Sequence, residues 1–343
     1  MKFVCYSTWE ELPTSANLLF EQAEKTNVFF SRAWFENVTA SLNDDHALLL
    51  ACVMEGEKVQ ALLPLMTSGN NKTWYSLRHG FTAHYSLLLA EDAQGSVIAY
   101  LAESLSQLPV NGVLLEPVAT DDENLNQLRE QLEARGFRCE YLFRNYNWVY
   151  PLQGQSYAEY MAARPTQLRN TIARKQRKLE REQGYTIRLF TGDDVPAHMG
   201  DYYVVYNASW KQNEERYLDF QDDFIADFSK AGWTRLAVLY VNEQAVAAQL
   251  WFVYHGTASI FRLAYDKGWR KYSVGSILTS FLMEYAIDTD KVQEIDFLTG
   301  NDAYKQDWMS LRRERFLLSC VKQQRSMSQY ERLIEWFKRI LNK

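Results

Sequence analysis

Short strand-like runs, with clear alternation of apolar and polar positions at 2–6, mark the expected strands of the first half of the chain, and helical patterns lie between them. Segments 46–54 and 59–66 flank a turn that contains Gly56 and are expected to form a hairpin. The expected strands are 2–6, 46–54, 59–66, 73–77, 85–89, 112–118 and 137–150, and the expected helices are 8–25, 31–42, 95–107 and 121–135.

The second half repeats this order of elements, although the residues themselves do not repeat. Its expected helices are 156–163, 166–182, 195–210, 219–231, 274–288, 302–307 and 326–341, and its expected strands are 185–190, 234–241, 244–254, 257–265, 292–298 and 312–321. We therefore predict an α/β fold with mixed sheets (α+β), built from two tandem units, 1–150 and 151–343.

Length and composition are consistent with this division, because 343 residues suit two domains and 47% hydrophobic residues supply both cores. The formal net charge of -6 argues against a general nucleic-acid binder. The N-terminal residues do not resemble a secretory signal, and no apolar run of about 18 residues occurs. We expect a cytoplasmic protein without a membrane span.

Cysteine and histidine positions give no sign of a metal site. Cysteines 5, 52, 139 and 320 form no CxxC pair and are expected to be reduced core thiols rather than disulfides. The five histidines show no HExxH spacing. No GxSxG, Walker A or GxGxxG motif occurs, which argues against hydrolase, P-loop and Rossmann functions.

The segment 266–276 joins an expected strand to an expected helix and carries two cations, Arg270 and Lys271. Ser273 is the expected N-cap, and Gly275 lies in the first turn. Free backbone N–H groups beside positive charge form a suitable seat for a pyrophosphate. The alternative is an ordinary amphipathic helix with two surface cations.

A second group of chemically active side chains follows the expected strand 292–298. Asp296, Tyr304 and Lys305 offer a carboxylate, a phenol and an amine, which are suited to a base, an acid and an electrostatic clamp. Alternatively, the carboxylate caps a turn and the amine is solvated.

Helix 166–182 belongs to a basic stretch, 164–181, with seven basic residues and one acidic residue. This stretch is either a solvated face or a cradle for an anionic ligand such as a coenzyme phosphate, a cell-wall precursor or a tRNA.

Several of these segments carry a family pattern. The pattern lies in the stretches KYSVGSILTSFLMEYAI, EIDFLTGNDAYKQDW, RNTIARKQRKLERE and FFSRAWFENV. In these stretches the chain resembles the CelD/BcsL-type family of GNAT acetyltransferases, which are related to the FemAB peptidyltransferases. The resemblance spans most of the chain, and residues 262–308 carry its specific part.

The resemblance implies a tandem GNAT-like fold that transfers an acyl group from acetyl-CoA or another acyl-CoA to an amine. The acceptor would be a small molecule or a cell-envelope precursor, and no metal is needed. It also implies that Asp296, Tyr304 and Lys305 occupy the family's catalytic positions. The implied donor-binding residues are Tyr265, Arg270, Lys271, Tyr272, Ser273, Val274, Gly275 and Ser276.

One departure from the pattern leaves alternatives open. The ordinary GNAT phosphate loop has the spacing Arg/Gln-x-x-Gly-x-Gly/Ala, whereas residues 271–276 contain one glycine. An aminoacyl-tRNA-dependent, FemAB-like transferase acting on a cell-wall precursor therefore remains an alternative. A non-catalytic GNAT-like binding module is another.

Overall fold

The chain divides into two compact units in the computed structural model, which describes residues 1–69, 72–93, 95–209 and 218–323. The first unit contains residues 1–146 and the described residues from Glu314 onward, and the second contains residues 147–313. The chain therefore leaves the first unit four residues before the expected joint at 150/151. It also returns a final strand to that unit, which the sequence did not indicate.

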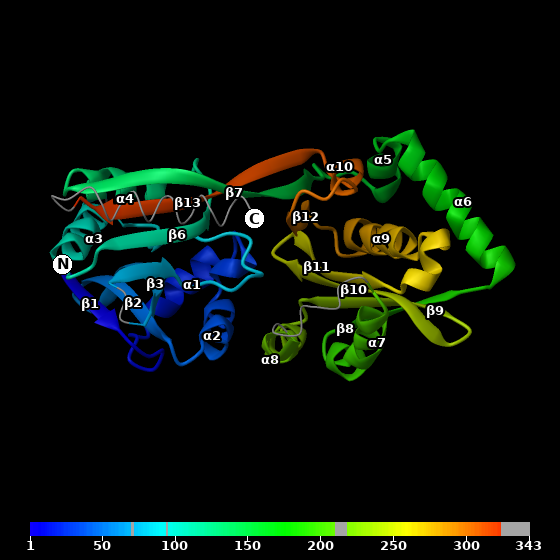
Figure 1. Cartoon of the computed structure of the whole chain (residues 1–343), viewed down its shortest axis with the longest axis horizontal. Coiled ribbons are helices and arrows are strands. Elements are labelled where there is room, and N and C mark those ends of the chain that lie inside the picture. The colour runs from blue at the N-terminus through cyan, green and yellow to red at the C-terminus, as the bar shows by residue number, and fades with distance from the viewer. Residues whose placement is uncertain (70–71, 94, 210–217, 324–343) are drawn as a thin grey trace. The chain divides into compact units, whose positions relative to one another are not determined.

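The first unit is built on a sheet with the strand order β1-β2-β3-β4-β6-β13-β7. Helices α3 and α4 pack on each other, and α1 packs on β3 (Figure 1). Its elements are β1 (Lys2–Tyr6), α1 (Ala16–Ala23), η1 (Val28–Phe30), α2 (Arg32–Ala40), β2 (His46–Glu55), β3 (Lys58–Ser68), β4 (Thr73–Ser76), β5 (Leu88–Leu89), α3 (Gly95–Gln107), β6 (Gly112–Val118), α4 (Glu123–Glu133), β7 (Phe137–Pro151) and β13 (Leu311–Lys322).

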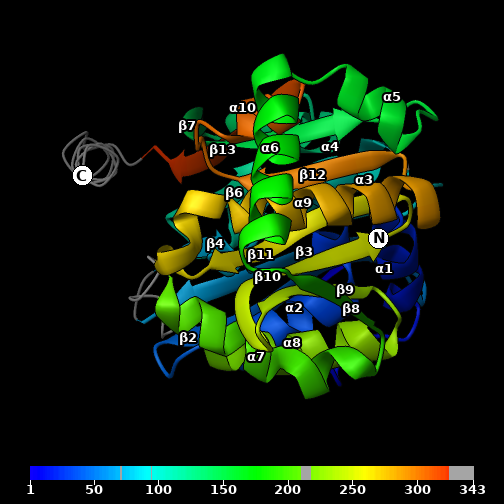
Figure 2. The same ribbon diagram turned by 90° about the vertical axis from the view of Figure 1, so that its right-hand side faces the viewer.

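The second unit has the strand order β7-β12-β11-β10-β9-β8, with α9 on one face and α7 and α8 on the other. Figure 2 shows α6 crossing in front of α9, with which it is in contact. The elements are α5 (Tyr157–Ala162), α6 (Thr166–Glu182), β8 (Thr186–Thr191), α7 (Asp194–Ala208), α8 (Leu218–Lys230), β9 (Thr234–Val241), β10 (Gln244–Tyr254), β11 (Thr257–Tyr265), η3 (Lys267–Tyr272), α9 (Val274–Glu284), η4 (Tyr285–Thr289), β12 (Glu294–Thr299) and α10 (Lys305–Trp308).

Both units share one unusual pairing, a parallel pair within a largely antiparallel sheet. In the first unit β4 runs parallel to β6, and in the second β11 runs parallel to β12. A helix connects the strands of each pair, α3 in the first and α9 in the second. The structure thus contains the repeated order of elements that the sequence predicts.

Local turn chemistry explains why the antiparallel strands form where they are expected. The β9–β10 turn places Asn242 and Glu243 at positive φ, and the β10–β11 turn does the same with His255 and Gly256. Two-residue turns with positive φ at both positions match the twist of a hairpin. The three strands following residue 233 are therefore set by local sequence.

One expected helix is shorter in the structure than the sequence predicts. The helix expected at 8–25 is wrong in its first half, since α1 begins only at Ala16. Pro13 has no N–H to donate and disfavours a helical conformation at Leu12, so a helix cannot run through this point without strain. The helix expected at 326–341 lies outside the described residues.

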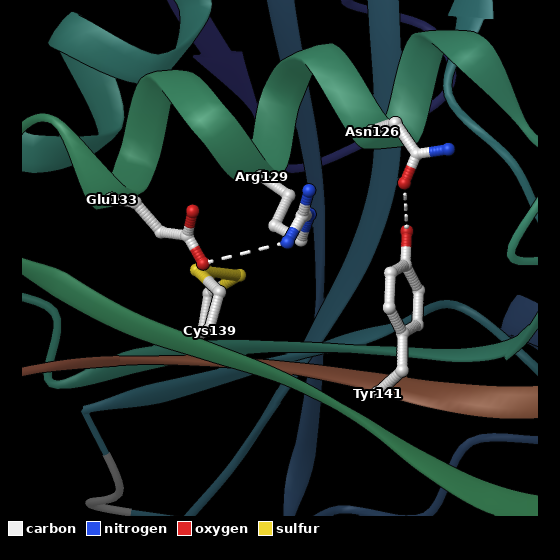
Figure 3. The surroundings of a disulfide bond; sticks show 6 residues. Asn126, Arg129, Glu133, Cys139 and Tyr141 are labelled. Atoms are coloured by element: carbon white, nitrogen blue, oxygen red, sulfur yellow. Dashed lines mark hydrogen bonds and ion pairs between the residues drawn. A yellow bond between two sulfur atoms is a disulfide. The ribbon is translucent and has the colours of Figure 1, made fainter.

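The prediction of four reduced cysteines is also wrong, because Cys139 and Cys320 form a disulfide. Cys139 lies in β7 and Cys320 in β13, at a sequence separation of 181. Figure 3 shows the bond beneath α4, where Tyr141 donates to Asn126 at 2.9 Å. A pair brought together by strand order leaves no spacing signal, which is why the sequence did not reveal it. Cys5 and Cys52 are free thiols.

Glu116 of β6 is held between two arginines, Arg78 and Arg144. Burial raises the pKa of Glu116, but the hydrogen bonds and charges of Arg144 and Arg78 outweigh burial, so the pKa lies below its ordinary value. A carboxyl group whose pKa is lower in the folded protein than in the unfolded chain stabilises the fold at pH values above the unfolded-state pKa. This stabilisation is lost as the pH falls through the folded-state pKa.

We expect Glu116→Gln to lower the free energy of unfolding at pH 7 by about 2 kcal/mol, because two partly buried charge-assisted bonds weaken. The difference from the unsubstituted protein should shrink as the pH falls below about 4. Urea unfolding at a series of pH values measures this, with the exposed carboxyl variant Glu10→Gln as the control. A difference that does not change with pH would contradict the assigned charge.

Candidate active site

The parallel strands β11 and β12 separate from each other partway along their length. They pair only where Thr257–Ser259 face Glu294–Asp296. β11 continues to Tyr265 alongside β10, with a bulge where Trp251 faces Ile260 and Leu250 faces Arg262. In the described part of the chain no strand pairs with this edge of β11 beyond Ser259. Over the rest of its length, this edge of β11 therefore has no partner strand among the described residues.

The start of α9 follows directly from the end of β11 through the single short segment η3. Arg270 and Lys271 lie exposed in the last turn of η3. Ser273 occupies the expected N-cap position, but its side chain makes no capping bond, because the residue adopts the left-handed conformation with φ 55° and ψ 41°. The expected side-chain cap is thus wrong, and the first N–H groups of α9 are not satisfied by Ser273.

Gly275 allows α9 to approach the sheet closely. A Cβ at Gly275 would lie 3.1 Å from Cδ1 of Tyr265, which ends β11. A side chain at this position would therefore require the Tyr265 ring or the first turn of α9 to shift by a few tenths of an ångström. Two of the expected donor-binding residues, Tyr265 and Gly275, are thus in contact.

The basic helix α6 lies against the same loop. Lys175 donates to the carbonyl oxygen of Lys271. The hydroxyl of the buried Tyr272 donates to Glu182 at 3.1 Å, and the ammonium groups of Lys178 and Lys271 lie 5.4 and 4.8 Å from its ring centre. Several cations thus gather around the start of α9, with Glu182 as a partial counter-charge.

Asp296 lies in β12 at the point where the two strands separate. Its side chain is 8% exposed, and Oδ1 accepts hydrogen bonds from Asn147 at 2.5 Å and from the backbone N–H of Leu298 at 2.6 Å. The flanking residues Ile295 and Phe297 pack in the core cluster that includes α9. Because side chains alternate along a strand, Asp296 points to the opposite face of the sheet.

The ring of Tyr304 lies 6.2 Å from that of Phe297. The residue is 40% exposed, yet burial of the phenol raises its pKa, and the charge of Asp302 raises it further. The hydroxyl therefore stays protonated at neutral pH.

Lys305 is buried, and its ammonium group is bonded to the backbone. It donates to the carbonyl oxygens of Phe297, Leu298 and Thr299 at 2.8, 3.4 and 2.7 Å. These bonds hold the irregular end of β12, where Leu298 has φ 51° and Gly300 φ 123°. Lys305 thereby fixes the segment that leads to Tyr304.

The corresponding place in the first unit is closed. β4 and β6 pair over Thr73–Tyr75 and Gly112–Leu114. Immediately beyond, the Ser76 hydroxyl donates to the carbonyl of Glu116 at 2.8 Å and accepts from its N–H at 3.1 Å. The end of strand pairing, the adjacent helix start and the cations therefore occur together in the second unit.

Three features of the site were not predicted from the sequence. The β11 bulge and the Asn147–Asp296 bond depend on strand pairing and leave no local signal. The third feature is Gln249, a buried residue of β10 that bonds to the first turn of α9, and it does leave a local signal in the sequence. It is an uncharged polar residue within the otherwise apolar run 245–254, a position that calls for a buried partner.

Among the described residues, no three His, Cys, Asp or Glu side chains are grouped to hold a metal ion. Within the same ranges, no helix has both the length and the apolar character needed to cross a membrane.

Comparisons with known proteins identify the type of domain. Residues 166–306, which lie within the second unit, match the family model of an acetyltransferase (GNAT) domain. A search of curated proteins gave no match.

Solved structures resemble the chain over almost its whole length. FemX has a TM-score of 0.61 at 10% identity, covering 93% of this chain and 97% of its own. L-PGS from Bacillus licheniformis has a TM-score of 0.54 at 14% identity, covering 87% and 95%. A tandem GNAT protein from the clavulanic acid biosynthesis pathway has a TM-score of 0.51 at 11% identity, covering 95% and 99%.

The predicted fold is therefore confirmed: the chain has an α/β tandem GNAT-like fold. Its second unit contains a GNAT acyltransferase-type domain. The narrower resemblance to the CelD/BcsL type stays a prediction, as do the roles of the individual site residues and the cytoplasmic location.

Proposed function

We propose that the second unit transfers an acyl group from acyl-CoA, in the first instance acetyl-CoA, to an amine. The proposal rests on the separation of β11 from β12 beside the start of α9. An open strand edge can accept the amide-rich pantetheine arm of the coenzyme, as a sheet edge accepts a peptide. The N–H groups of α9 then meet the pyrophosphate, beside Arg270 and Lys271.

The chemistry needs no covalent enzyme intermediate. The amine nitrogen attacks the thioester carbonyl carbon, the carbon–sulfur bond breaks, and the acyl group becomes an amide. Backbone N–H groups at the β11 bulge stabilise the developing oxyanion. The amine proton passes to Asp296, directly or through water, and Tyr304 gives a proton to the departing thiolate. Lys305 positions Tyr304 through its bonds to the end of β12.

A second candidate is an aminoacyl-tRNA donor, as the FemAB resemblance implies, with a cell-wall precursor as acceptor. The observation in its favour is the exposed arginine row of α6, in which Arg174, Arg177 and Arg181 recur at helical spacing. A tRNA held by this row would lose affinity steeply with added salt, because each phosphate contact releases counterions. A single coenzyme with few phosphates depends on salt less.

Amine-dependent release of free thiol from acetyl-CoA tests the transfer. The protein is incubated with acetyl-CoA and a panel of amino sugars, peptides and diamines, and free thiol is followed with a chromogenic disulfide. We expect release that requires one class of amine and yields an equal amount of its amide. Acetyl-CoA binding without release for any amine would instead favour the non-catalytic binding module.

A further inference from the structure

Gln249 is a polar residue buried in the centre of the second unit. Its side chain is 1% exposed in the middle of β10, beneath α9. Nε2 donates to the carbonyl oxygen of Gly275 at 3.0 Å and to Oγ1 of Thr279 at 2.7 Å, and Oε1 accepts from Nε1 of Trp251 at 3.0 Å. Both amide hydrogens and the amide oxygen therefore have partners.

An apolar side chain at this position would avoid the cost of burying an amide. The neighbouring residues Val246, Ala247, Ala248, Leu250 and Trp251 are all apolar and buried. What the glutamine adds is a directional bond to one peptide group, the one that joins Gly275 to Ser276.

The two polar groups of this peptide, its carbonyl oxygen and its N–H, are linked in orientation. In a planar trans peptide, the carbonyl oxygen of Gly275 and the N–H of Ser276 point in opposite directions. The N–H groups of the first turn have no partner within a helix and point out of its N-terminus. A bond that fixes the Gly275 carbonyl therefore also fixes the direction of the Ser276 N–H. Contact with Tyr265 fixes the same turn from β11.

We propose that Gln249 is a positioning residue that orients the Ser276 N–H toward the pyrophosphate of the acyl donor. This inference rests on the proposed acyl-CoA function. The Ser273 side chain does not cap the helix, so the turn takes its orientation from the sheet below it, through Gln249 and Thr279. Gln249 itself touches neither the donor nor the acceptor.

The test compares CoA with pantetheine, which lacks the phosphates, for the unsubstituted protein and for Gln249→Met. Methionine keeps the length of the side chain but cannot donate to Gly275. We expect CoA affinity to fall about tenfold, the value of one bond to a charged group, while pantetheine affinity is unchanged. The same exchange at a buried glutamine of the first unit, Gln60→Met, is the control and should alter neither affinity.

Equal losses for CoA and pantetheine would show a merely structural role and overturn the inference, as would an unchanged CoA affinity. If Gln249→Met does not fold, Thr279→Val serves instead, because it removes one partner of Nε2 and a second bond to Gly275. A smaller loss, again confined to CoA, is then expected. If the unsubstituted protein binds pantetheine but gains nothing from the phosphates of CoA, both this inference and the proposed donor site fail.

Discussion

Replacing both Arg270 and Lys271 with alanine should weaken acetyl-CoA binding by about 100-fold. Each cation is expected to make a charge-assisted bond to the pyrophosphate, and because both side chains are exposed we expect each bond to contribute about 1.4 kcal/mol, or tenfold in affinity. Both side chains are exposed in η3, so their removal should leave the thermal stability of the protein nearly unchanged. Calorimetric titration with acetyl-CoA measures the dissociation constant of each variant.

The matched control removes two equally exposed cations from the neighbouring helix, Arg174 and Arg177. With a coenzyme donor, this pair should change the affinity less than threefold, since it lies on the outward face of α6. With a tRNA donor the ranking would reverse. A larger loss from the α6 pair than from the η3 pair would therefore contradict the proposed position of the donor.

Asp296→Asn should lower the rate of amine-dependent thiol release by about 100-fold and leave acetyl-CoA affinity unchanged. The asparagine oxygen can still accept from Asn147 and from the N–H of Leu298, so the geometry of β12 is retained. What is lost is the capacity to take a proton, and a positioned base contributes about 100-fold or more.

The matched control is Asp307→Asn, a carboxylate in α10 that takes no part in the proposed mechanism. It should leave the rate within twofold of the unsubstituted protein. Turnover unaffected by Asp296→Asn would remove this residue from the proposed mechanism, whatever its effect on stability.

Local sequence predicted those parts of the fold that local forces determine. Strands β9, β10 and β11 were predicted with their bounds, because short apolar runs and the turns at Asn242 and His255 are properties of adjacent residues. Pro13 carried an equally local signal that the extended helix prediction overlooked. The positive φ angles of the hairpin turns and the helix-breaking effect of Pro13 are both backbone preferences that need no tertiary partner.

The site was predicted only as a list of residues, because its geometry arises from distant segments. Where β12 separates from β11, Lys305 and Asp296 bond to the backbone of an irregular strand end. Gln249 and Gly275 meet because a strand and a helix cross, and Cys139 meets Cys320 because β13 returns to the first unit. Such meetings follow from topology and leave no spacing in the sequence.

We propose that this GNAT-like chain uses a coenzyme donor in its second unit. Calorimetric titration of the unsubstituted protein with acetyl-CoA, repeated at about 50 and 200 mM salt, tests it most directly. Saturable binding at one site, with a modest decrease in affinity at the higher salt, is the expected result. No binding of acetyl-CoA or of longer acyl-CoAs, with salt-sensitive binding of aminoacyl-tRNA in its place, would contradict it.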